Sequence, residues 1–257
     1  MKKIVDFSRY SSIKVGPKVE VEIIEEISKK NEEFFLIGGA NNILVSPNPP
    51  KLAKLSKKFD YIKIKNGELI IGAATPTGKV VSFCKKYNIG GFEFLSKLPG
   101  TIGGAIKMNA GVKEYEIKDV LKWIRTFEGI IKREDIKMEY RKSDIQNIIY
   151  EAGFELKNGF DNTLLKKLLN LRTNQPKLPS AGSIFKNPKD DFAGRVIENV
   201  GLKGYRVGNM AFSEIHANFL VNLGEGSFKD ALTLIELAKE KVFKKYKIVL
   251  EEEIIII

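Results

Sequence analysis

Short apolar runs separated by turn residues fill the first third of the chain, a pattern typical of strands mixed with helices. Residues 34–37 predict a buried strand, and residues 43–45 predict a second one. Residues 61–65 and 68–73 flank Asn66-Gly67, a dipeptide that favours a two-residue turn, and therefore predict a β-hairpin. The remaining predicted strands are residues 118–127 and 149–156.

Apolar side chains spaced three and four residues apart predict four amphipathic helices. The first begins at Thr77, ends at Asn88 and is expected to carry Tyr87 on its apolar face. The third is expected to turn Phe192 inward. The expected N-terminal caps of the last three helices are Asn162 or Thr163, Asp190 or Asp191, and Ser227 in a capping box with Asp230.

The polar, turn-prone stretch 157–161 is the expected boundary between two domains, residues 1–157 and 158–257. The chain has no apolar run of membrane-spanning length, and its N-terminus lacks the apolar stretch of a signal peptide. A single cysteine, Cys84, rules out a disulfide framework within the chain and gives no sign of a metal cluster. A cytoplasmic location is therefore expected.

The formal net charge of +11 raises the question of a polyanionic partner such as nucleic acid. The lysines are spread over predicted helices in solvated pairs, such as Lys57-Lys58, rather than gathered in one arm or tail. No strand face interleaves aromatic residues with lysines, as single-strand-binding sheets do. The sequence therefore predicts neither nucleic-acid binding nor membrane insertion, and a monomer is expected.

Two glycine-rich loops lie next to predicted strands, at residues 38–42 and 99–104. Glycine lets backbone amides approach phosphate oxygens, and a row of such amides forms an anion-binding nest. Neither loop fits the dinucleotide fingerprint that runs into a helix, and neither is a Walker loop. Together with a third glycine turn at Gly111, the loops favour a dinucleotide whose pyrophosphate needs several amides.

Segment 179–188 carries the most distinctive chemistry. Ser183 follows Gly182, and glycine permits a sharp turn that directs the hydroxyl toward a ligand. Lys186 and Asn187 suit an anionic substrate that accepts hydrogen bonds. For His216, the sole histidine, a structural role and a ligand-binding role both stay open.

In this order, the motifs resemble one family, the UDP-N-acetylenolpyruvoylglucosamine reductases, flavoproteins of bacterial peptidoglycan precursor synthesis. The resemblance covers nearly the whole chain, and the serine turn and the Pro-Gly-Thr loop are its most specific parts. It is carried by residues 37–44, 91–95, 99–105, 108–111, 140–143, 172–176, 179–188, 201–204, 216–219 and 250–254.

The resemblance implies an α+β fold, with an FAD-binding domain of the vanillyl-alcohol-oxidase type followed by a smaller α/β substrate-binding domain. It implies non-covalent FAD, NADPH as co-substrate, and a nucleotide-sugar substrate whose enolpyruvyl double bond is reduced to a lactyl ether. The choice between NADPH and NADH stays open. The residues that match flavin-binding positions are Gly38, Gly39, Ala40, Asn41, Asn42, Pro99, Gly100, Thr101, Gly103, Gly104, Asn109 and Gly111.

By the same resemblance, Arg141 and Glu253 stabilise the negative charge that develops on the substrate carboxylate, and Ser183 donates a proton to the neighbouring carbon. Because a serine hydroxyl is a weak acid, its activation by Lys186 or by a bound water is expected. No metal is expected. The residues that match substrate-binding positions are Tyr140, Lys186 and Asn187.

Some positions depart from the usual family pattern. Ala40 and Asn41 stand where the family usually has a glycine and a serine, which removes one hydroxyl contact to phosphate. The residues after Glu253 lack the usual arginine and glycine, so Glu251 and Glu252 remain alternatives for the catalytic carboxylate. No insertion matches the substrate-capping tyrosine loop of the longer family type, so the shorter type is expected.

Three competing interpretations stay open at this point. The first is another flavin oxidoreductase of the same superfamily with a different substrate. The second is a basic nucleotide-binding or nucleic-acid-binding module without catalysis. The third is a homologue that keeps the fold without turnover.

Overall fold

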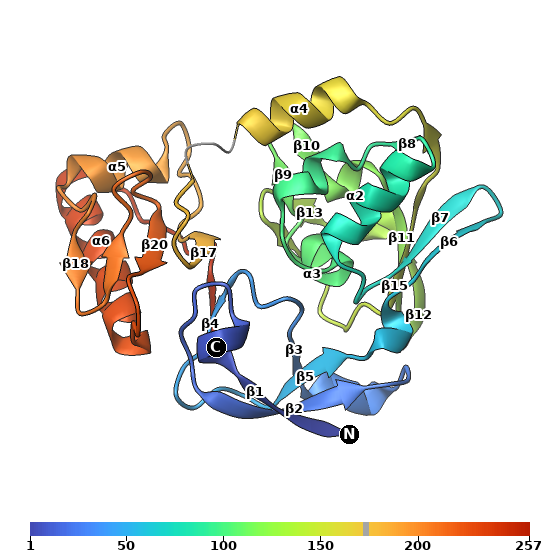
Figure 1. The fold of residues 1–257 in the computed structure, drawn as a ribbon, viewed down its shortest axis with the longest axis horizontal. Helices are drawn as coiled ribbons and strands as arrows, with labels where there is room; N and C mark the ends of the chain where they lie inside the picture. The colour runs from blue at the N-terminus through green and yellow to red at the C-terminus, as the bar shows by residue number, and fades with distance from the viewer. Residues whose placement is uncertain (172–174) are drawn as a thin grey trace. The chain divides into compact units, whose positions relative to one another are not determined.

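The computed structural model describes residues 1–171 and 175–257, which form two compact units (Figure 1). The first unit comprises Met1–Lys3, Val21–Gly39 and Lys51–Thr173. The second comprises Ile4–Glu20, Ala40–Pro50 and Asn174–Ile257. Both units therefore draw on the N-terminal fifty residues, a division that the pattern of polar stretches does not reveal.

An antiparallel five-stranded sheet is the centre of the first unit. The predicted hairpin at Asn66-Gly67 is confirmed, because Lys65 pairs with Glu68 across it. Both turn residues have positive φ, 53° and 74°, as a type I′ turn requires. In sheet order, the strands are β12 (Gly129–Lys132), β11 (Leu121–Thr126), β15 (Glu151–Glu155), β7 (Glu68–Gly72) and β6 (Ile62–Lys65).

Helices α2 (Thr77–Lys86) and α3 (Ile102–Lys107) pack beside this sheet (Figure 1) and contribute Val80, Cys84 and Ile106 to its core. Tyr87 does not lie on the buried face as expected. It follows the last turn of α2, is 51% exposed and packs on Phe83, with ring centroids 4.4 Å apart.

Helix α4 (Asn162–Asn170) also belongs to the first unit, where Leu168 and the preceding Phe160 are buried. Its cap is Asp161 rather than Asn162 or Thr163, because the Asp161 carboxylate accepts the amides of Thr163 and Leu164 at 2.8 and 2.9 Å. The expected boundary stretch is itself structured, since β16 (Lys157–Asn158) pairs with β8 (Ile89–Gly90).

A second sheet has the order β1-β2-β5-β3, and β5 runs parallel to both β2 and β3. The predicted strand at 34–37 is present as β3, although only Ile37 of this run is buried. The strands are β1 (Lys2–Asp6), β2 (Lys18–Ile24), β5 (Leu52–Leu55) and β3 (Phe35–Leu36). Smaller elements are α1 (Phe7–Tyr10), β9 (Gly111–Val112), β10 (Tyr115–Glu116), β13 (Met138–Glu139) and β14 (Lys142–Ser143).

The second unit is built on an antiparallel sheet crossed by α6 (Phe228–Tyr246), which also contacts α5 (Ala193–Asn199) (Figure 1). Ser227 caps α6 as predicted, because its hydroxyl accepts the amide of Asp230 at 3.0 Å. The sheet order is β17 (Ser180–Ser183), β20 (Phe219–Asn222), β19 (Met210–Phe212) and β18 (Arg206–Val207). A separate parallel pair joins β4 (Ile43–Leu44) to β21 (Ile255–Ile256).

Phe192 is not inside the second unit as expected but 67% exposed, at the N-cap of α5. The Asp191 carboxylate accepts the amide of Phe192, and the Asn187 side-chain oxygen accepts the amide of Ala193 at 3.1 Å. These two bonds start the helix after Phe192, so that Ala193 takes the buried position.

Candidate active site

The two glycine-rich loops meet at Gly38 and Thr101. A Cβ atom at position 38 would lie 2.6 Å from Thr101 Oγ1, a separation that side chains do not tolerate. Thr101 is the N-cap of α3, and its hydroxyl accepts the amide of Gly104 at 3.4 Å. The second loop therefore does run into a short helix, which the sequence pattern did not predict.

The backbone amides of the two loops differ in what they already bind. In the second loop, the amides of Ile102 and Gly103 donate to the carbonyls of Thr75 and Ala73 at 3.0 and 2.9 Å. In the first loop, the amides from Gly39 to Asn41 donate no hydrogen bond to any described residue. Ala40 has a left-handed φ of 52°, the kind of turn in which successive amides form an anion nest.

Asn42, the last residue of the first loop, holds the C-terminal strand. Its Nδ2 donates to the Glu253 carbonyl at 2.7 Å, and its own carbonyl accepts the amide of Ile255 at 3.0 Å. The pairing of β21 with β4 continues this contact, so that Glu253 has a fixed main-chain position in the second unit.

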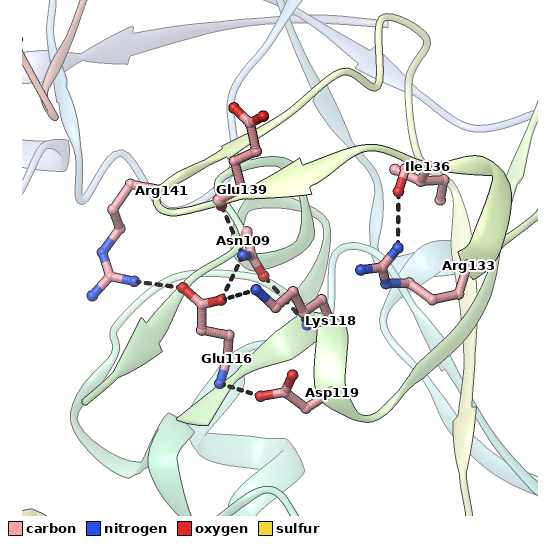
Figure 2. A network of polar contacts seen from close by, with 8 residues as sticks. All are labelled: Asn109, Glu116, Lys118, Asp119, Arg133, Ile136, Glu139 and Arg141. Atoms are coloured by element: carbon pink, nitrogen blue, oxygen red, sulfur yellow. Dashed lines mark hydrogen bonds and ion pairs between the residues drawn. The ribbon is translucent and has the colours of Figure 1, made fainter. Parts of the chain in front are cut away.

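Arg141 lies in the turn between β13 and β14, with left-handed φ of 56°. Its Nη2 donates to the Gly111 carbonyl at 2.7 Å, and its guanidinium carbon lies 4.8 Å from the Tyr140 ring centroid. Its Nη1 lies 3.8 Å from Glu116 Oε1 (Figure 2). The side chain is only 16% exposed, so the guanidinium is held rather than freely solvated.

Asn109 and Gly111, which match flavin-binding positions, both lie next to Arg141 or its partner Glu116. The Asn109 side-chain amide donates to Glu116 Oε2 at 3.0 Å and to the Glu139 carbonyl at 2.8 Å (Figure 2). Gly111 contributes its carbonyl to Arg141 itself.

Ser183 lines a cavity of about 360 Å³ in the second unit. Its hydroxyl makes no hydrogen bond to any described residue, and it follows Gly182, whose φ is 85°. Asn187 lies in the same lining. The lining residues are Ser183, Asn187, Phe192, Gly194, Arg195, Glu198, Ile215, His216, Ala217 and Asn218.

His216, for which the sequence leaves a structural and a ligand-binding role open, lies in the lining of this cavity. Its Nδ1 accepts the amide of Asn218 at 3.2 Å, and burial lowers the pKa of the imidazole below its usual value. A Cβ atom at Gly194 would lie 2.9 Å from the His216 ring, so the helix backbone approaches the imidazole closely.

Arg195 and Asn218 are among the cavity residues that the sequence did not predict as site residues. Asn218 holds the serine turn, since its side chain accepts the amide of Phe185 at 3.0 Å and donates to the carbonyl of the same residue at 2.7 Å. Arg195 pairs with Asp191 four residues earlier and holds the pKa of that carboxyl at about 2. That spacing is visible in the sequence and predicts an ion pair on one helix face, but it does not indicate a cavity.

The three C-terminal glutamates have different surroundings. Glu251 pairs with Lys186 at 3.3 Å, and Glu252 pairs with Lys239 on α6. The amide of Glu253 donates to the carbonyl of Ile184 at 2.7 Å, directly beside Ser183 in the chain. Within the part of the chain that the structure describes, no hydrogen bond joins Lys186 to Ser183, so the ammonium group is directed to Glu251 instead.

Residues 1–171 and 175–257 hold neither a candidate membrane span nor a candidate metal site. No helix there is long and apolar enough to cross a membrane. In the same residues, no group of three His, Cys, Asp or Glu side chains is placed to hold a metal ion. The first three residues of the family-like segment 172–176 lie outside the described residues.

The chain is similar to known reductases along its whole length. The reductase named UDP-N-acetylenolpyruvoylglucosamine reductase in Helicobacter hepaticus is 49% identical, over 98% of this chain and 97% of its own. Its namesake in Campylobacter jejuni strain RM1221 is 48% identical, over 99% of this chain and 100% of its own. The chain belongs to the UDP-N-acetylenolpyruvoylglucosamine reductase family.

Two further comparisons agree with membership of the reductase family. The family model for the reductase C-terminal domain matches residues 174–257. The crystal structure of the reductase from Thermus caldophilus superposes with a TM-score of 0.88, covers 100% of this chain and 98% of its own, and is 29% identical. The predicted α+β fold of the vanillyl-alcohol-oxidase type is thereby confirmed.

Proposed function

We propose that this protein is an FAD-dependent reductase that uses NADPH to convert UDP-N-acetylglucosamine enolpyruvate into UDP-N-acetylmuramate. The observation that carries the proposal is the Ser183 cavity, in a chain similar to reductases of this name over its full length. As part of the same proposal, the enzyme is a cytoplasmic monomer. Residues 1–157 bind the flavin, and residues 158–257 contribute the main part of the nucleotide-sugar site.

The backbone of the first glycine loop fits a pyrophosphate. We assign the phosphate contacts to the amides from Gly39 to Asn41, because they donate to no described residue and surround a left-handed turn. In the second loop we assign contacts to Gly100 and Thr101, and we give Gly103 a packing role against Ala73. When bound, the flavin supplies the hydride carrier between NADPH and substrate.

The proton that completes the reduction comes from Ser183. Its hydroxyl lies in the cavity without a partner among the described residues, so its proton is available to the substrate carbon next to the one that receives hydride. Because Lys186 is paired with Glu251, we assign activation of the serine to a water in the cavity rather than to this lysine. Proton transfer of this kind typically contributes about 10²–10⁴-fold to a rate.

Arg141 and Glu253 stabilise the charge that develops beside that carbon. Hydride addition places negative charge on the substrate carboxylate, and a fixed guanidinium stabilises this charge more in the transition state than in the ground state. Glu253 acts in its protonated or hydrogen-bonded form. The groups that bind the anionic parts of the nucleotide sugar are Tyr140, Lys186 and Asn187.

Anaerobic stopped-flow absorbance of the purified holoenzyme tests the function. The flavin is reduced with NADPH and then mixed with UDP-N-acetylglucosamine enolpyruvate. Rapid return of the oxidised flavin band is expected. A flavin that is reduced but not reoxidised moves the function to a different acceptor, and a preparation without flavin contradicts the cofactor assignment.

The same instrument tests the role of Ser183. In Ser183→Ala, reduction by NADPH is expected to proceed at nearly the wild-type rate, whereas reoxidation by substrate slows by about 10²-fold or more. The reductive step is the internal control, because it needs no proton from this residue. Equal losses in both steps contradict a proton-donor role.

A further inference from the structure

A buried carboxylate lies behind Arg141. Glu116, at the end of β10, is only 9% exposed. One of its oxygens, Oε2, accepts the Asn109 amide at 3.0 Å and pairs with Lys118 Nζ at 2.5 Å. The other oxygen, Oε1, faces the Arg141 guanidinium, with 3.8 Å between Oε1 and Nη1 (Figure 2).

Main-chain bonds fix the position of this carboxylate. The amide of Glu116 donates to Asp119 Oδ2 at 2.8 Å, which closes a capping box at the following turn. The Asn109 amide bridges Glu116 to the carbonyl of Glu139, in the strand just before Arg141. The hairpin that carries Arg141 and the turn that carries Glu116 are therefore joined by one side chain (Figure 2).

The charges in this group favour binding of an anion. A buried carboxylate paired with Arg141 alone would neutralise the guanidinium that is proposed to meet the substrate. Lys118 supplies a second positive charge to the same carboxylate, so the three side chains together keep one net positive charge. Glu116 can therefore hold the guanidinium in place while the cluster still attracts a carboxylate.

We propose that Glu116 is a positioning residue that orients the Arg141 guanidinium toward the substrate carboxylate, with Lys118 offsetting its charge. The inference rests on the role proposed above for Arg141. A charge fixed in advance stabilises a developing negative charge without reorganisation during the reaction, whereas an untethered arginine must be ordered by the substrate.

The test is Glu116→Gln in the holoenzyme, followed in both half-reactions. We expect reoxidation by UDP-N-acetylglucosamine enolpyruvate to slow by about tenfold, a size typical of coupled neighbours, while reduction by NADPH stays at the wild-type rate. The matched control is Glu134→Gln. This carboxylate pairs with Lys132 at 3.8 Å, is 69% exposed and belongs to no part of the cluster, so no change in either rate is expected.

A double-mutant cycle with Arg141→Ala separates positioning from a general structural effect. If Glu116 acts through Arg141, Glu116→Gln causes no further slowing of reoxidation once Arg141 is removed. The same tenfold loss in both backgrounds overturns the inference. If Arg141→Ala itself leaves reoxidation unchanged, the role proposed for Arg141 is wrong, which is a separate outcome.

A second variant covers the case in which Glu116→Gln does not fold. In Lys118→Met the Glu116 carboxylate remains, but Arg141 is then the only cation of the three side chains that pairs with it. The group of Glu116, Arg141 and residue 118 therefore loses its net positive charge. We expect the KM for the nucleotide sugar to rise by about tenfold with NADPH reduction unchanged. An unchanged KM overturns the charge-balance part of the inference and with it the proposed arrangement.

Discussion

The side-chain amide of Asn42 donates a 2.7 Å hydrogen bond to the main-chain carbonyl of Glu253, 211 residues further along the chain. The carbonyl of Asn42 accepts the amide of Ile255, and the amide of Ile257 donates to Leu44, so the C-terminal strand is attached along its length. A residue that matches a flavin-binding position therefore also anchors the segment of the proposed catalytic glutamate, just before the C-terminal strand.

Replacing Asn42 with alanine tests this attachment. Asn42→Ala is expected to lower the free energy of unfolding by about 1 kcal/mol, because the Glu253 carbonyl loses its side-chain donor. Urea unfolding measures this change, and faster hydrogen exchange at the amide of Ile255 locates it. Asn41→Ala is the control, since the Asn41 side chain bonds to no described residue; equal stability of both variants contradicts the anchoring role.

The three C-terminal glutamates give a matched set of variants. We expect Glu253→Gln to slow reoxidation by substrate by about tenfold or more, because this carboxylate is proposed to face the developing charge. Glu251→Gln and Glu252→Gln break only the pairs with Lys186 and Lys239, so their reoxidation rates are expected to stay near wild type. Stopped-flow reoxidation compares the three, and a larger loss in either of the last two would reassign the catalytic carboxylate.

Gly38→Ala tests the close approach of the two glycine loops. The new methyl group would lie 2.6 Å from Thr101 Oγ1 and displace the hydroxyl that caps α3. Loss of an N-cap typically costs about 1 kcal/mol, so the free energy of unfolding is expected to fall by at least that much, together with flavin affinity. Gly78→Ala is the control, because a Cβ atom at that position in α2 meets nothing within 4 Å.

His216 predicts a loss of stability in mild acid. Burial lowers its pKa below 6.5 in the folded protein, so the unfolded chain binds the proton first as the pH falls. Its effect on stability is absent well above 6.5; the destabilisation grows as the pH falls through that value and becomes constant once the folded protein also takes up the proton. Urea unfolding should show that the free energy of unfolding falls more for the wild type than for His216→Gln when the pH is lowered from about 8 to about 5.5. Equal losses of stability in the two proteins would contradict the assignment of this pH dependence to His216.

Local elements were determined by the sequence alone. The hairpin at Asn66-Gly67 depends on two adjacent residues that accept positive φ, and the start of α6 depends on Ser227 and the amide of Asp230 three residues later. Interactions between residues so close in the sequence do not depend on the rest of the fold, so the sequence pattern predicts them correctly. The order of the family-like motifs likewise indicates the family without reference to the fold.

Contacts between groups far apart in the sequence depend on the complete fold. Asn42 bonds to Glu253, Asn109 links Glu116 to the hairpin of Arg141, and Lys186 pairs with Glu251 rather than with Ser183. Such partners depend on where the chain returns after many residues, and periodicity records only which side of an element is apolar. The same reason explains Phe192, an apolar residue in helical register that the hydrogen bonds at the start of α5 leave outside the core.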